Sequence, residues 1–131
     1  MGTRSVIAVR NETGGWKGRY CHWDGYPEGV GAAVQAIVER DGVEKAIKTL
    51  TEDHYGWSSV DVGEAPVLGP GYDDGRFVAV PGYGIAYTTK DGQSDPDVWI
   101  SSSESIDWWG WGCEYVHIID PKTGEVVSQE L

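Results

Sequence analysis

An aromatic and acidic turn near the N-terminus holds the residues best suited to contact a ligand. The run 22–29 reads His-Trp-Asp-Gly-Tyr-Pro-Glu-Gly and leads into a helix-like segment. Asp24 and Pro27 favour a turn, and the following helix start offers backbone N–H groups and a positive dipole end. Such a turn suits an anion, with Trp23 or Tyr26 stacking on a ring. The alternative is architectural, with both aromatic side chains packing the turn against the helix.

A basic segment leads directly into this turn. Residues 1–23 contain four basic side chains and one acidic side chain, namely Arg4, Arg10, Lys17 and Arg19 against Glu12. The whole chain holds 10 basic and 21 acidic side chains and has a net charge of −11. This charge argues against general binding to nucleic-acid backbones. Three interpretations of the basic segment stay open. It could bind a small anion, dock an acidic partner, or pair with the acidic remainder of the chain.

These residues predict a non-enzymatic site for a small anionic, nucleotide-like ligand, formed by a basic N-terminal hairpin and the aromatic turn 22–29. The predicted ligand contacts are Arg4, Lys17, Arg19, His22, Trp23, Asp24 and Tyr26. The three cations would contact the anion, His22 and Asp24 its polar edges, and Trp23 or Tyr26 would stack. No cofactor is expected. Two alternatives stay open: an acidic interaction module that mimics nucleic acid or inhibits a host protein, and a small hydrolase that uses Asp and His.

Other reactive side chains lack the spacing that catalysis or metal binding requires. Cys113 and His117 would share one face of a strand, but no Cys-x-x-Cys or His-Glu-x-x-His spacing accompanies them, so no metal site is expected. The run 56–60 lacks the final glycine of a nucleophile elbow. Cys21 and Cys113 are expected to be reduced thiols. The tryptophan-rich run 108–111 suits a ligand platform and a packed loop equally.

Size and composition predict one domain spanning residues 1–131. A chain of 131 residues with 40% hydrophobic side chains has the usual size and composition of a single globular core. No signal peptide is visible, and no apolar stretch approaches the ~20 residues that a membrane span needs. A cytoplasmic location without a membrane partner is therefore expected. The sequence does not decide between a monomer and a homo-oligomer.

The elements that must position these side chains are strands followed by two helices and further strands. Strands are predicted over 5–9, 16–23, 76–80, 85–89, 98–101, 114–119 and 126–129, and a long surface loop over 54–75. Apolar residues at helical spacing predict a first helix from Val30 to about Arg40. Asp41 and Glu44 resemble a capping box that starts a second helix with Leu50 facing inward. This order predicts an α+β domain: an antiparallel sheet of about five to six strands with two short helices on one face.

Several segments resemble a group of uncharacterised small proteins of actinobacteria and their phages. The segments are Met1-Gly2-Thr3-Arg4-Ser5 and the runs 22–31, 54–59 and 80–87. The resemblance covers most of the chain, and the His-Trp-Asp-Gly-Tyr-Pro element is its most specific part. It brings no catalytic residues. It implies a cytoplasmic, phage-associated accessory protein that acts by binding, for example by sequestering a host signal.

Overall fold

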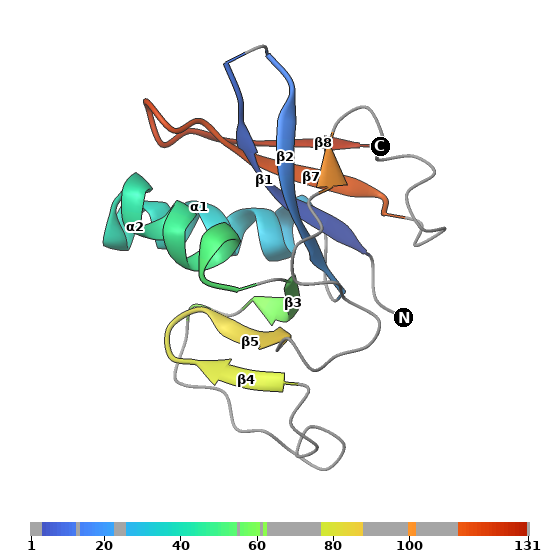
Figure 1. Ribbon diagram of the computed structural model, residues 1–131, viewed down its shortest axis with the longest axis vertical. Helices are drawn as coiled ribbons and strands as arrows, with labels where there is room; N and C mark the ends of the chain where they lie inside the picture. The colour runs from blue at the N-terminus through green and yellow to red at the C-terminus, as the bar shows by residue number, and fades with distance from the viewer. Residues whose placement is uncertain are drawn as a thin grey trace.

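Eight strands form one sheet that carries a helical layer on one face (Figure 1). The computed structural model describes residues 4–12, 14–22, 26–54, 56–60, 62, 77–87, 100–101 and 113–130. The strands are β1 (Ser5–Arg10), β2 (Trp16–Cys21), β3 (Gly56–Val60), β4 (Phe77–Val80), β5 (Gly84–Tyr87), β6 (Ile100–Ser101), β7 (Tyr115–Ile119) and β8 (Val126–Glu130). The helical layer consists of a π-helical turn η1 (Pro27–Gly31), α1 (Ala32–Asp41), α2 (Val43–Ile47) and a second π-helical turn η2 (Lys48–Glu52).

The sheet mixes parallel and antiparallel pairs. Its order is β4-β5-β3-β2-β1-β7-β8, and β6 pairs with β2 outside this path. The pair β1–β7 and the pair β2–β3 are parallel, whereas the hairpin pairs β1–β2, β4–β5 and β7–β8 are antiparallel. The α+β class is confirmed, but the predicted all-antiparallel sheet of five to six strands is wrong. The helical layer carries the chain from β2 to β3 as a crossover, and such a connection allows parallel pairing.

The helices follow the predicted apolar spacing. Val34, Ile37 and Leu50 are fully buried against the sheet. The predicted capping box is wrong, because α2 begins after Gly42 without a side-chain cap. Gly42 has φ +90°, a conformation that glycine adopts readily where one helix ends. Asp41 is instead the last residue of α1.

Strand β3 lies inside the stretch that the sequence predicts as a surface loop. Trp57 of β3 is fully buried, and its indole Nε1 donates a hydrogen bond to the Leu50 carbonyl at 2.8 Å. The surface-loop interpretation is therefore wrong for 56–60, where small and polar residues around Trp57 hid a strand. Residues 63–76 lie outside the described part of the chain.

Buried side chains occupy both faces of the sheet. The cluster under the helices includes Ile7, Cys21, Ile37, Trp57 and Ile119. The cluster on the opposite face consists of Val6, Ala8, Trp16, Val116 and Ile118, with Tyr20 and Cys113 packed against it. Strand β1 contributes to both clusters, as expected for a strand near the middle of a sheet. No helix in the described residues is long and apolar enough to span a membrane.

Candidate functional site

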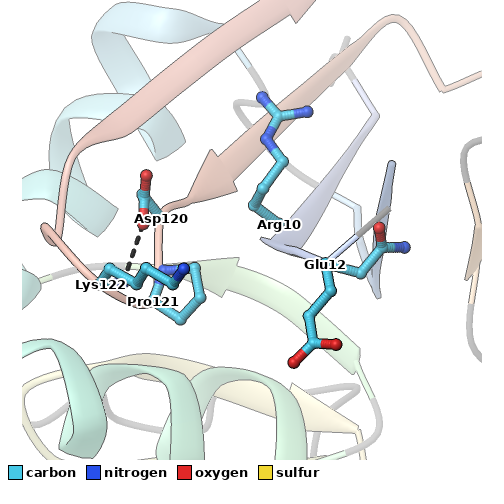
Figure 2. A pocket seen from close by; sticks show the side chains of 6 residues that line it. Arg10, Glu12, Asp120, Pro121 and Lys122 are labelled. Carbon is cyan, nitrogen blue, oxygen red and sulfur yellow. Dashed lines mark hydrogen bonds between the residues drawn. The ribbon is translucent and has the colours of Figure 1, made fainter. Parts of the chain in front are cut away.

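A pocket of about 380 Å³ lies between the turn that joins β1 to β2 and the turn that joins β7 to β8 (Figure 2). We call it the hairpin-tip pocket. Its lining residues are Arg10, Asn11, Glu12, Asp120, Pro121 and Lys122. Strands β1 and β7 are parallel neighbours, so their carboxyl ends lie at the same edge of the sheet. The turns that follow them are therefore brought together.

The β7–β8 turn fixes one side of the pocket. The Asp120 carboxylate accepts hydrogen bonds from the backbone N–H groups of Lys122 at 2.8 Å and Thr123 at 3.3 Å. The pKa of Asp120 is lowered, mainly by the hydrogen bond from the Lys122 N–H. The positive charge of Arg10 lowers it by a smaller amount. Asp120 thus stabilises its own turn. The Lys122 side chain is left exposed at the pocket.

The β1–β2 turn fixes the opposite side. Arg10 Nη1 donates a hydrogen bond to the Gly14 carbonyl at 3.0 Å, and the Asn11 backbone N–H donates to the Gly15 carbonyl at 3.0 Å. These bonds hold the guanidinium of Arg10 against its own turn. Figure 2 shows the Arg10 guanidinium and the Glu12 carboxylate pointing in opposite directions. Two basic and two acidic side chains therefore surround one cavity.

The predicted ligand contacts are not gathered in one place. Arg19 is 4% exposed, and its Nε donates a hydrogen bond to the Thr51 carbonyl at 2.8 Å. Lys17 is exposed. Strand alternation does place both side chains on one face, but that face lies under η2 at Arg19. Arg19 is thereby part of the packing between β2 and the helical layer.

Arg4 and His22 belong to a second group, which we call the Tyr20–His22 cluster: Arg4, Tyr20, His22 and Cys113. The Tyr20 hydroxyl and His22 Nδ1 are 2.7 Å apart. Burial raises the pKa of Tyr20 and, together with the Arg4 charge, lowers the pKa of His22. A protonated phenol therefore shares a hydrogen bond with a neutral imidazole. Burial also raises the pKa of Cys113 to about 11, so its thiol is a poor nucleophile.

The remaining predicted contacts are placed elsewhere or not described. Tyr26 is 44% exposed, and its ring centroid lies 6.1 Å from that of Tyr115 in β7. Trp23, Asp24 and the run 108–111 lie outside the described residues.

The three histidines lie in separate places among the described residues. His54 packs against Trp57 on the helix-covered face, with ring centroids 5.2 Å apart, whereas His22 bonds to Tyr20, which packs on the opposite face. His117 Nδ1 lies 2.8 Å from the hydroxyl of Ser128, but His117 is fully buried and Gly31 packs over the pair. A Cβ at Gly31 would lie 2.8 Å from the Ser128 hydroxyl, so no substrate has room there.

The expected sharing of one strand face by Cys113 and His117 is wrong. Strand β7 begins at Tyr115, so regular alternation does not extend back to Cys113, which packs on the face opposite to His117. Cys21 and Cys113 are both free thiols, as predicted. Within the part of the chain that the structure describes, no group of three or more His, Cys, Asp or Glu side chains is placed to hold a metal ion.

The sequence reasoning missed the hairpin-tip pocket. The sequence identifies Arg10 as a cation and predicts strands over 114–119 and 126–129, but no local pattern indicates that β1 and β7 are parallel neighbours. A search for similar proteins gives no further guidance, because no family model, curated protein or solved structure matches the chain.

Proposed function

We propose that this chain is a non-enzymatic binding protein for a small anionic ligand, and that Arg10 and Lys122 hold the anion in the hairpin-tip pocket. One observation carries the proposal: two basic side chains from neighbouring turns line a single cavity of about 380 Å³. Small-molecule sites commonly have volumes of roughly 300–1,000 Å³. A guanidinium offers a planar fork of donors to a phosphate or carboxylate, and an ammonium adds a compact positive charge.

The proposal keeps the basic N-terminal hairpin as the binding element but moves the ligand from the 22–29 turn to the hairpin tip. Arg19 is left out because its side chain is buried and bonded to the Thr51 carbonyl. At the tip, backbone hydrogen bonds hold both turns before any ligand arrives. A site that is already ordered loses less conformational entropy when it binds.

The proposal includes the accessory role that the resemblance to small proteins of actinobacteria and their phages implies. A protein that sequesters a small signalling molecule needs a site of this size and no catalytic group. None of the residues that line the hairpin-tip pocket is Ser, Cys or His. The described lining therefore offers no thiol, imidazole or serine hydroxyl as a nucleophile.

Calorimetric titration with inorganic phosphate, ethyl phosphate and adenosine monophosphate tests the proposal. We expect at least one of the three to bind, and Lys122→Gln to raise its Kd about five-fold, the effect of losing an exposed ion pair of about 1 kcal/mol. Lys17→Gln is the matched control, because Lys17 is an exposed lysine of the same hairpin that does not line the pocket. Its Kd should equal that of the wild type.

Two results would overturn the proposal. If none of the three anions binds, the small-ligand function is removed and the acidic interaction module becomes the better hypothesis. If Lys17→Gln weakens binding as much as Lys122→Gln does, the anion is attracted by general charge rather than by the pocket. Adenosine monophosphate binding more tightly than ethyl phosphate would support a nucleotide-like ligand.

A further inference from the structure

We infer that the hairpin-tip pocket selects a compact zwitterion, whose phosphate or carboxylate group meets Arg10 and Lys122 while its ammonium group meets Glu12. The inference rests on the proposed function, since it names the class of ligand for the same site. It adds a third contact residue and a requirement for a positive group on the ligand.

The charges that line the pocket cancel. Arg10 and Lys122 are balanced by Glu12 and Asp120. The two carboxylates differ in what already holds them. Asp120 accepts two backbone N–H bonds within its own turn. Within the described residues, no hydrogen bond or ion pair engages the Glu12 carboxylate.

An anion without a positive group meets repulsion from Glu12 in addition to the attraction of Arg10 and Lys122. Glu12 and Asp120 line the same cavity as the two cations, and the chain as a whole has a net charge of −11. The field of an acidic protein disfavours ligands of high negative charge. A ligand that also carries an ammonium group replaces repulsion at Glu12 by attraction.

The geometry allows one small molecule to meet both kinds of charge. Figure 2 shows the Arg10 and Glu12 side chains pointing in opposite directions, with Pro121 and Lys122 across from them. A zwitterion can therefore present its anionic group to the two cations and its ammonium group to Glu12. The Pro121 ring offers an apolar surface for the methylene groups between them.

The lining also argues for a ligand without an aromatic ring. No aromatic side chain is among the described residues that line the pocket. A base or other ring would gain no stacking contact from these side chains, and such contacts provide much of the affinity for aromatic ligands. A short aliphatic zwitterion makes full use of the groups that are present.

The test compares O-phosphoethanolamine with ethyl phosphate by calorimetry. The two probes have a similar size and the same phosphate monoester, but only the first carries an ammonium group. We expect the wild type to bind O-phosphoethanolamine about five-fold more tightly, the ratio that one exposed ion pair of about 1 kcal/mol provides. Glu12→Gln should abolish this preference and bind ethyl phosphate more tightly than the wild type does. Glu12 is exposed in a turn, so the variant should fold normally.

Each outcome decides between the inference and the proposed function. The wild type could bind both probes with equal affinity, and Lys122→Gln could weaken the binding of both. This result overturns the zwitterion inference and leaves the anion site intact. A preference for O-phosphoethanolamine that persists in Glu12→Gln overturns the role of Glu12. Failure of both probes to bind overturns the proposed function and the inference together.

Discussion

The two ends of the β1–β2 hairpin both carry polar side chains, but those at one end bond to each other and those at the other end line a cavity. In the Tyr20–His22 cluster, a phenol and an imidazole bond to each other and a thiol is shielded by burial. At the tip, Arg10 and Glu12 face a cavity that also contacts the β7–β8 turn. Figure 1 shows the β1–β2 turn extending beyond the helical layer. Packing around a residue, rather than its chemical type, therefore separates structural groups from those that line the cavity.

The largest expected effect is on the free energy of unfolding, and it should differ between the two cations of β2, Arg19 and Lys17. Arg19→Met should lower the free energy of unfolding by about 2 kcal/mol, because the buried Thr51 carbonyl loses a donor from a charged group. Lys17→Met should change it by no more than about 0.5 kcal/mol, because the Lys17 side chain is exposed. Urea denaturation measures both values.

The same pair of variants also separates stability from binding. Folded Arg19→Met protein should bind ethyl phosphate with the wild-type Kd, since Arg19 does not line the pocket. A stable Arg19→Met variant that no longer binds the anion would contradict the assignment of Arg19 to packing.

A smaller effect should appear in the pH dependence of stability. The folded protein holds the pKa of His22 below 6.5, through burial and the Arg4 charge. The unfolded chain therefore binds more protons than the folded protein as the pH falls below 6.5. The stabilisation is complete above pH 6.5 and is lost as the pH falls toward the folded pKa of His22.

Urea denaturation at pH 7.5 and pH 5 measures this loss. His54 has a lowered pKa for the same main reason, burial, and contributes in the same direction. His22→Gln should therefore reduce the loss of stability between the two pH values without removing it. If His22→Gln loses as much stability between pH 7.5 and pH 5 as the wild type does, the pKa of His22 is not lowered in the folded protein.

Much of the fold was predictable because it depends on local patterns. Alternating and β-branched residues predicted the β1–β2 and β7–β8 hairpins, and apolar residues at helical spacing predicted α1. Strand β3 was missed because Trp57 lies between small and polar neighbours, and its burial comes from contacts with distant parts of the chain. Parallel pairing was missed because it depends on which strands become neighbours.

The site was harder to predict than the fold. Strand alternation places Lys17 and Arg19 on one face of β2, but alternation does not say which face a helix will cover. Arg10 and Lys122 lie near opposite ends of the sequence and meet only because β1 and β7 pair. The sequence therefore indicated the basic hairpin, and the tertiary structure indicates which part of that hairpin faces a cavity.

The most direct test of the account is an NMR titration of the isotope-labelled protein with ethyl phosphate. The backbone amide resonances of Asn11, Glu12 and Lys122 should shift progressively, because these residues line the hairpin-tip pocket. Those of Tyr20 and His22 should stay in place. Shifts confined to Tyr20 and His22, with the resonances of the two turns unchanged, would contradict the assignment of the anion to the hairpin tip.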